Sequence, residues 1–250
     1  MAFFEGSIYS DALGISTSIC VSLPYDTNNK SDGKPPVLYL LHGLFDNHTA
    51  WVRNTNVDML AKKYGFAVVM PNAGKSYYTD MKYGPKYFTY ISEELPELCR
   101  RMFNVSEKRE KTFVAGISMG GYGALKLGLR RPDIFGGCAG ISAAADIKPR
   151  AADYKNRPEM RAVFGETGVA PEDDDLFLLA EKQRGTKCKI LMHCGLSDTK
   201  LNENRGLYKA LLKNGFDVEY IESEGAHDWT YWERILPQVM EYFALRGVNL

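Results

Sequence analysis

The residues Gly116, Ser118 and Gly120 form a Gly-x-Ser-x-Gly motif. In such a motif a strained turn carries the serine hydroxyl above the end of a sheet, and the glycines leave room where the backbone approaches itself. A serine hydroxyl is a weak nucleophile at neutral pH, so chemistry at Ser118 requires a base and a carboxylate that orients the base. If Ser118 is a nucleophile, a histidine and an acidic residue elsewhere in the chain must supply the base and the carboxylate.

The base is expected to be a histidine, and the chain has four. His227 alone lies in a loop beyond an expected strand late in the chain, where the base of an α/β-hydrolase follows the acid. His42 and His48 precede the serine, and His193 lies inside an expected strand. We therefore predict His227 as the base, with His193 packed in its strand and His48 in a turn.

The acid is expected between the nucleophile and the histidine. Asp198 follows a strand of the predicted sheet, as the orienting carboxylate of such a site would. Asp146, after the preceding strand, and Asp228, beside the histidine, are alternatives. Strand-end position favours Asp198, because Asp228 would point away from its neighbour.

A developing oxyanion needs two backbone N–H donors, one from the residue after the nucleophile and one from a loop after an earlier strand. Met119 and Leu44 occupy these positions. His42-Gly43-Leu44 follows the apolar run 37–41 directly, and an ordinary strand-end turn is the alternative interpretation. We also predict His42, Gly43 and Trp229 beside the substrate, while a core position for Trp229 stays open.

Apolar runs that alternate with helical patterns predict the elements behind these residues. Residues 15–23 alternate apolar and polar side chains, which predicts a half-buried antiparallel edge strand. Strands that follow helices in alternation predict a mostly parallel sheet with helices on both faces, the α/β class. Residues 26–36 are expected to form a surface loop. Further strands are expected at 37–41, 66–70, 113–115, 135–142, 189–194 and 218–221, and helices at 47–64, 88–103, 119–131, 201–212 and 229–245.

Residues 143–185 interrupt this alternation with charges and prolines, and their length exceeds a simple connection. We predict a partly helical cap, inserted at about 145–183, over the end of the sheet. Its apolar residues, including Phe164 and Phe177, are expected to face the substrate. The run Asp173-Asp174-Asp175 is interpreted as a helix N-terminus and not as a metal site, because no histidine accompanies it.

The composition narrows the classes of partner. Thirty-one basic and 31 acidic residues leave no net charge, so bulk electrostatics predicts neither a nucleic-acid nor a membrane partner. No stretch of 18 apolar residues and no secretory leader are found, and a cytoplasmic protein with one domain over 1–250 is expected. Five cysteines without a Cys-x-x-Cys pair predict buried thiols.

The motifs together resemble the tributyrin esterase branch of the esterase D family, which also contains bacterial feruloyl (cinnamoyl) esterases. The similarity covers nearly the whole chain and is carried by Leu41-His-Gly-Leu44, Gly116-Ile-Ser-Met-Gly120, Gly195-Leu-Ser-Asp198 and Gly225-Ala-His-Asp-Trp229. It implies an α/β-hydrolase fold and a serine carboxylesterase with Ser118, Asp198 and His227 as its triad. It also implies a small-molecule ester as substrate, no cofactor, no metal and, in many members, a homo-oligomer.

The resemblance leaves the ester open. Short-chain acyl and hydroxycinnamoyl (feruloyl-type) esters, cleaved through an acyl-enzyme, are both expected substrates. Members with aromatic-acyl specificity can present a tryptophan from the cap, and residues 143–185 contain none. A thioesterase similar to S-formylglutathione hydrolase would use the same triad, and a non-catalytic binding protein on a hydrolase scaffold is a third alternative.

Overall fold

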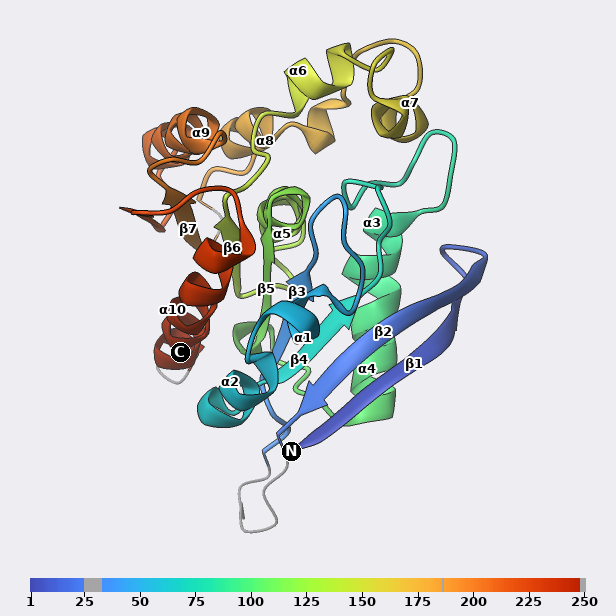
Figure 1. The fold of residues 1–250 in the computed structure, drawn as a ribbon, viewed down its shortest axis with the longest axis vertical. Coiled ribbons are helices and arrows are strands. Elements are labelled where there is room, and N and C mark those ends of the chain that lie inside the picture. The colour runs from blue at the N-terminus through green and yellow to red at the C-terminus, as the bar shows by residue number, and fades with distance from the viewer. Residues whose placement is uncertain (25–32, 186, 248–250) are drawn as a thin grey trace.

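A mixed sheet of eight strands forms the centre of the computed structural model, which describes residues 1–24, 33–185 and 187–247 (Figure 1). The strand order is β1-β2-β4-β3-β5-β6-β7-β8, in which β1 and β2 run antiparallel to their neighbours and the rest are parallel. The predicted α/β class is therefore confirmed. The strands are β1 (Ala2–Ser10), β2 (Ile15–Leu23), β3 (Val37–Leu41), β4 (Ala67–Pro71), β5 (Thr112–Ile117), β6 (Gly137–Ile141), β7 (Lys189–Gly195) and β8 (Val218–Ser223).

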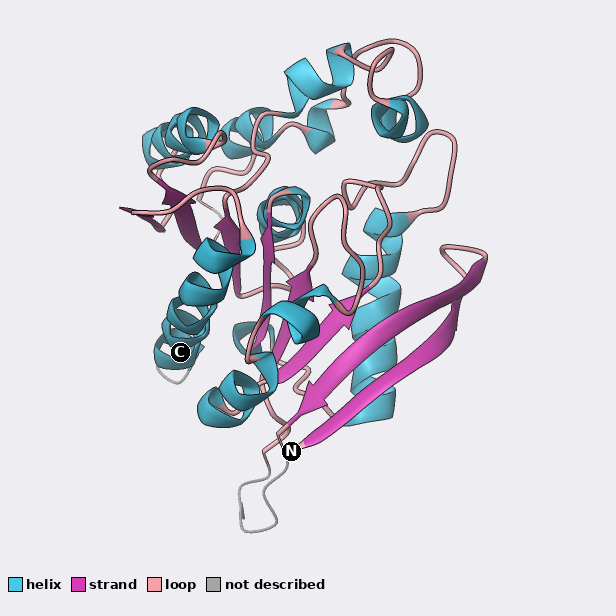
Figure 2. Cartoon of the chain, viewed as in Figure 1, coloured by secondary structure: helices cyan, strands magenta, loops and turns pink. Residues whose placement is uncertain are grey.

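Helices cover both faces of the sheet because successive side chains of a buried strand point to opposite sides (Figures 1 and 2). Leu38 and Leu40 of β3 pack with α1 (Ala50–Asn54), α2 (Val57–Tyr64) and α10 (Trp229–Gly247). Tyr39 and Leu41 belong to the other core. That core packs against α4 (Leu95–Phe103), α5 (Met119–Arg130), α8 (Leu176–Lys182) and α9 (Leu201–Lys213).

The edge of the sheet differs from the prediction. Residues 15–23 form β2 as expected, but β2 pairs with both β1 and β4 and is therefore an inner strand. The edge strand is β1, whose side chains are mostly exposed and which was not predicted. Its only strong sequence signal, Phe3-Phe4, lacks the alternation that marks a half-buried strand. The surface loop expected at 26–36 lies mostly outside the described residues.

Two of the expected helices are divided. The helix predicted through Tyr64 separates into α1 and α2, because the Asn54 amide and the Thr55 hydroxyl donate to carbonyls of the first helix and compete with its backbone N–H groups. The helix expected at 88–103 consists of α3 (Tyr87–Thr89), a π-helical turn (Tyr90–Glu94) and α4. Pro96 has no N–H to donate, and the wider turn before it accommodates that defect. Helix α10, in contrast, continues through Pro237.

The segment between β6 and β7 holds short helices, which lie at the top of Figure 1. They are α6 (Ile147–Ala152), α7 (Pro158–Phe164), a 3₁₀ turn (Glu172–Asp174) and α8. Another 3₁₀ turn, Arg109–Lys111, lies elsewhere in the chain, directly before β5. The long loop after β4 is joined to α7, since Lys82 N–H donates to Val163 O at 2.8 Å and Tyr83 N–H to Ala162 O at 2.9 Å. Asp175 caps α8 by accepting from Phe177 N–H, so the expected helix N-terminus at the acidic run is confirmed.

All five cysteines are buried free thiols, as predicted. None of the helices in the described residues combines the length and apolarity that a bilayer crossing requires.

Candidate active site

Ser118 lies at a sharp turn between β5 and α5. Its backbone has φ 52° and ψ −113°, a strained combination for a residue with a side chain. A Cβ atom on Gly116 would lie 2.5 Å from Gly120 C, and one on Gly120 would lie 2.5 Å from Leu41 O. Both glycines are therefore required sterically, and the turn has the strand–turn–helix geometry expected of a nucleophile elbow.

Hydrogen bonds from neighbouring elements hold this strained residue. Ser118 N–H donates to Ile141 O at the end of β6, and Ser118 O accepts from the N–H groups of Tyr122 and Ala144, all at 3.0 Å. The backbone of the serine is thus bound on both sides. Its hydroxyl is left to point toward the histidine.

The side chains of Ser118, His227 and Asp198 form one hydrogen-bonded chain. Ser118 Oγ lies 3.0 Å from His227 Nε2, and His227 Nδ1 lies 2.9 Å from Asp198 Oδ1 and 3.0 Å from Oδ2. The three residues come from the elbow, the loop after β8 and the loop after β7, which meet at the carboxyl ends of parallel strands. The arrangement can pass a proton from the hydroxyl to an imidazole whose other nitrogen is held by a carboxylate.

Asp198 is buried and well supplied with donors. Burial alone would raise the pKa of its carboxyl, but hydrogen bonds from His227, from the Ser142 hydroxyl and from Lys200 N–H outweigh burial and hold the pKa below its usual value. The Ser142 hydroxyl in turn accepts from Trp232 Nε1 at 3.1 Å. Asp198 therefore stays a carboxylate beside His227.

A close approach of two loops places the acid beside the histidine. A Cβ atom on Gly195 would lie 2.4 Å from Gly225 O, so the loops that carry Asp198 and His227 touch through glycines. The imidazole of His227 also packs edge-to-face on Trp232, with ring centroids 5.1 Å apart. The His227 side chain keeps 25% of its surface exposed, which leaves it accessible from the cavity.

His42 supports the loop after β3 from behind. It is buried, and burial lowers the pKa of its imidazole to about 4, so the ring is neutral at physiological pH. Nε2 accepts from Ala73 N–H at 2.9 Å, which puts the proton on Nδ1, and Nδ1–H donates to Gly43 O at 2.7 Å. Tyr78 OH donates to His42 O at 2.9 Å. These bonds fix the direction of the Gly43 carbonyl and hence of the following N–H of Leu44.

The second expected donor, Met119 N–H, is at the first position of α5. The first N–H groups of a helix have no intrahelical acceptor, and the helix dipole makes this end favourable for negative charge. Gly43, Leu44 and Ser118 all border the same cavity. The structure thus brings the two predicted donor positions to the side of the serine.

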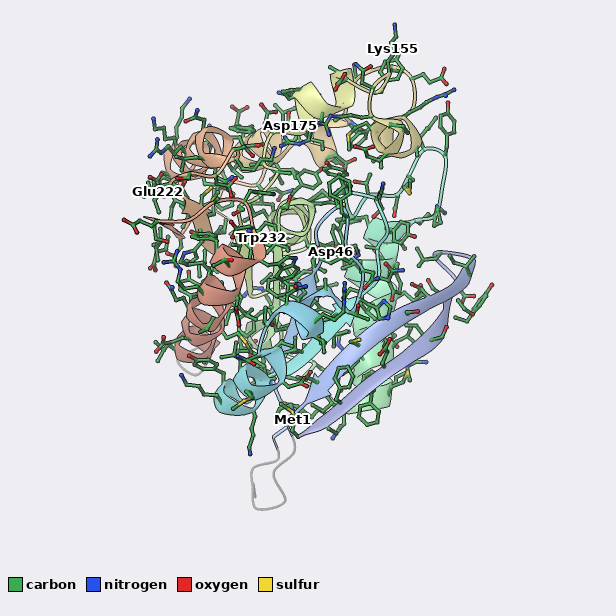
Figure 3. All side chains as sticks on the ribbon, viewed as in Figure 1. Met1, Asp46, Lys155, Asp175, Glu222 and Trp232 are labelled. Atoms are coloured by element: carbon green, nitrogen blue, oxygen red, sulfur yellow. The ribbon has the colours of Figure 1, made fainter. Side chains whose placement is uncertain are left out.

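A cavity of about 510 Å³ opens over Ser118. Asp46 and Trp232, both labelled in Figure 3, reach it from the loop after β3 and from α10. Three cationic side chains, Arg150, Arg157 and Lys200, line another part of it. The full lining is Gly43, Leu44, Phe45, Asp46, Tyr77, Ser118, Ala144, Arg150, Arg157, Thr199, Lys200, His227 and Trp232.

Of the five residues predicted to bind the substrate, one borders the cavity. Gly43 borders the cavity, whereas His42 is 1% exposed behind it. Trp229 is partly buried and packs edge-to-face against Trp51 and Trp232, at the border of the core and outside the cavity lining. Phe164 is buried in α7, and the partly buried Phe177 packs against the core beside α9; neither belongs to the cavity lining.

Several residues at the site were missed by sequence reasoning. Ser142 directly follows β6 and has φ 50°; it lies after a strand, as Asp198 does, and this signal was available. Arg150, Arg157 and Phe45 carried none, because a charge in a cap or an aromatic residue in a loop is normally a surface feature. The placement of the two arginines depends on how the segment 143–185 folds over the sheet.

The described residues contain one cluster with metal-ligating side chains, Glu5, Cys20 and His48, and none of these lines the cavity. Asp174 and Asp175 are used otherwise. Asp174 pairs with the buried Lys126 at 2.8 Å, and Asp175 caps α8 and pairs with Lys148 at 2.7 Å.

Known proteins resemble this chain in sequence and in fold. The family model for Esterase matches residues 10–243. The chain belongs to the Esterase family. Its sequence is 35% identical to the acetyl esterase of Caldicellulosiruptor saccharolyticus, over 98% of both chains. As in that family, the protein is a carboxylic ester hydrolase.

Solved structures agree with this assignment. The fluorophosphonate-binding serine hydrolase F (FphF) of Staphylococcus aureus superposes with a TM-score of 0.89 at 29% identity, over 97% of this chain and 98% of that chain. S-formylglutathione hydrolase (FrmB) of the same organism has a TM-score of 0.86 at 28% identity, with coverage of 97% and 98%. A ferulic acid esterase has a TM-score of 0.85 at 25% identity and 98% coverage of both chains. The fold is therefore that of the α/β-hydrolases.

Proposed function

We propose that the protein is a serine carboxylesterase that hydrolyses short-chain acyl or hydroxycinnamoyl esters through an acyl-enzyme, with Ser118 as nucleophile, His227 as base and Asp198 as orienting acid. The observation that carries the proposal is the continuous hydrogen-bonded chain from Ser118 Oγ to Asp198, 3.0 Å and then 2.9 Å long, at the cavity. We take the chain as one α/β-hydrolase domain with residues of about 145–183 as its cap.

The proposed reaction uses these groups in order. Ser118 Oγ attacks the ester carbonyl while its proton passes to His227 Nε2, and Asp198 stabilises the imidazolium that forms. The N–H groups of Leu44 and Met119 donate to the oxyanion. His227 returns the proton to the departing alkoxide, and the alcohol leaves an acyl-Ser118 ester. Water, deprotonated by the same histidine, then attacks the acyl group and releases the acid and the free serine.

The nature of the similar proteins supports short or hydroxycinnamoyl acyl groups. Those proteins include an acetyl esterase and a ferulic acid esterase. The cavity combines aromatic surfaces, from Phe45, Tyr77 and Trp232, with polar groups. A panel of acetyl, butyryl and feruloyl esters measures the preference as ratios of kcat/KM.

Labelling with a fluorophosphonate tests the nucleophile. Intact mass should show one adduct per chain in the wild type and none in Ser118→Ala, which should also lose esterase activity. Ser197→Ala removes an exposed hydroxyl beside Asp198 and is the matched control, which should label normally. Label on Ser118→Ala with retained activity would show that another residue is the nucleophile.

A thioesterase acting on S-formylglutathione is the second candidate, and the cationic side of the cavity favours it. Glutathione carries two carboxylates, and Arg150, Arg157 and Lys200 line the cavity. Arg150 is held by Glu203 in a two-pronged ion pair, with N–O distances of 2.9 Å and 2.8 Å. The Arg157 side chain is 41% exposed, and its ion pairs with Asp153 and Glu159 are longer, at 3.3 Å and 3.5 Å. Arg157 is therefore the cation best able to meet an anionic substrate.

Arg157→Met tests this candidate. It should reduce kcat/KM for S-formylglutathione about tenfold and leave that for butyryl esters unchanged, since an exposed ion pair contributes up to roughly 1 kcal/mol and a less exposed one more. Lys155→Met, which removes a neighbouring cation outside the cavity lining, is the control. An equal change of kcat/KM for both substrates would reject the proposed thioesterase activity and leave the serine mechanism intact.

A further inference from the structure

Three side chains that the esterase mechanism does not use meet beside the edge of the sheet. Glu5 of β1 and Cys20 of β2 are directly opposite partners in the antiparallel register, so their side chains lie on the same face. His48 reaches them from the loop between β3 and α1. The ligand atoms of the three residues all lie within 4.8 Å of one another.

The distance between His48 Nε2 and Glu5 Oε1 is close to the distance between two ligand atoms of a bound zinc ion. A tetrahedral site with Zn–S of about 2.3 Å and Zn–N and Zn–O of about 2.1 Å places its donor atoms roughly 3.4 to 3.6 Å apart. His48 Nε2 already lies 3.3 Å from Glu5 Oε1. The Glu5 side chain is 55% exposed and has room to rotate, and binding would draw the three ligand atoms from separations of up to 4.8 Å to about 3.5 Å.

The cluster combines a buried thiol, a largely buried imidazole and an exposed carboxylate. Cys20 is fully buried and lies directly opposite Glu5 in the antiparallel pair of β1 and β2. His48 is largely buried, with its Nδ1 atom shielded from solvent and without a hydrogen-bond partner. A carboxylate, a thiol that can ionise and an imidazole with one unpartnered buried nitrogen therefore lie together, and positive charge between them would be favourable.

We propose that Glu5, Cys20 and His48 bind a divalent cation of the zinc class, through Sγ, a ring nitrogen and a carboxylate oxygen, with water as the fourth ligand. Thiolate and imidazole favour zinc over magnesium or calcium, which prefer oxygen ligands. On binding, the Cys20 thiol loses its proton to solvent as the Zn–S bond forms, and no electron is transferred.

Such a cation would join three segments of the chain. It would tie the β1–β2 hairpin to the loop that also carries Leu44, four residues before His48. Because the unfolded chain does not hold these ligands together, binding should stabilise the folded protein. At about 100 times the dissociation constant, the Tm should rise by roughly 5 to 10 °C.

Titration of the full-length, metal-free protein with Co²⁺ tests ligation directly, because a thiolate bound to cobalt gives a charge-transfer band in the near ultraviolet. We expect this band in the wild type and in Cys99→Ser, which alters a buried thiol outside the cluster. We expect its loss in Cys20→Ser. Absence of the band in the wild type, or its persistence in Cys20→Ser, would overturn the proposal.

Two further variants separate ligation from folding and from the active site. Glu5→Gln is on the surface and should fold normally, yet it should weaken Zn²⁺ binding about tenfold or more by calorimetry. His227→Ala removes the histidine of the cavity and should leave Zn²⁺ affinity unchanged. Unchanged affinity in Glu5→Gln, or binding lost in His227→Ala, would place the cation elsewhere.

Discussion

Two aspartates each hold a basic side chain that contacts or belongs to the segment of Ser118 and helix α5, and the two pairs differ in exposure. At the first turn of this helix, Asp198 holds His227, whose side chain is 25% exposed and contacts Ser118. Two turns further along, Asp174 holds Lys126 at 2.8 Å, with side chains 8% and 0% exposed. Lys126 also donates to Thr79 Oγ1 and Tyr77 O.

The difference teaches what makes an acid–base pair able to do chemistry. His227 has one nitrogen free to exchange a proton with the serine and a cavity through which substrate arrives. The ammonium of Lys126 donates hydrogen bonds to Asp174 and to two further buried acceptors. Burial lowers the pKa of this ammonium, and the Asp174 carboxylate opposes that shift. The geometry of the first pair fits the acid–base role that we propose for it. The second pair ties the segment after β6 to helix α5, and Tyr122 OH donates to Asp174 O in the same region.

The largest effect should come from the Asp198–His227 pair. Asp198→Asn should leave the fold intact and reduce kcat by about 10⁴, because an amide fails to hold the histidine in its productive tautomer. Steady-state kinetics on a butyryl ester measure this. Asp146→Asn and Asp228→Asn, the rival acids, are controls, and a larger loss in either would identify a different acid.

The buried pair should govern stability with little effect on chemistry. Asp174→Asn leaves the Lys126 ammonium without its acid and should lower the free energy of unfolding by roughly 3 to 5 kcal/mol. Lys126→Met should cost less, because Arg130 Nη1 still lies 3.8 Å from Asp174 Oδ1. Urea unfolding measures both. Fluorophosphonate labelling of the folded variants should persist, and its loss would show that the buried pair also positions Ser118.

Stability should also fall on the acid side through two buried histidines. Burial lowers the pKa of His42 and of His193 from 6.5 to about 4, so the folded state binds fewer protons than the unfolded state between these values. Their contribution is complete above pH 6.5 and is lost as the pH falls toward 4, with a slope of up to about 1.4 kcal/mol per pH unit for each histidine.

Urea unfolding between pH 7 and pH 4.5 measures that slope. His193→Leu removes one of the two groups and should reduce the slope by about half. An unchanged slope in this variant would mean that His193 does not stay neutral in the folded protein.

The smallest effect concerns acyl preference. Phe45 is 85% exposed and lines the cavity, whereas Phe164 is 8% exposed and lies outside the lining. Phe45→Ala should change the butyryl-to-acetyl ratio of kcat/KM several-fold with stability within about 0.5 kcal/mol of wild type. Phe164→Ala should leave the ratio unchanged and cost roughly 3 to 5 kcal/mol. If Phe164→Ala changed the butyryl-to-acetyl ratio of kcat/KM at full stability, Phe164 would contact the substrate after all.

Much of the site was predictable because the chemistry is carried by strand ends. The elbow requires glycines at 116 and 120 for steric reasons, and parallel strands bring their carboxyl ends to one edge. The order Ser118, Asp198, His227 then follows from the chain alone. The structure joins these three side chains by hydrogen bonds, while their catalytic roles stay predictions until the variants are measured.

The sequence by itself determined the α/β alternation, the buried strands and the elbow, because periodicity and glycine sterics are local properties of the chain. Tertiary structure decided the rest. It made β1 the edge strand, placed Ser142 against Asp198, fixed the tautomer of His42 and turned Arg157 instead of Phe164 toward the cavity. Each of these outcomes depends on contacts between segments far apart in the chain, which local patterns of apolar and polar residues do not encode.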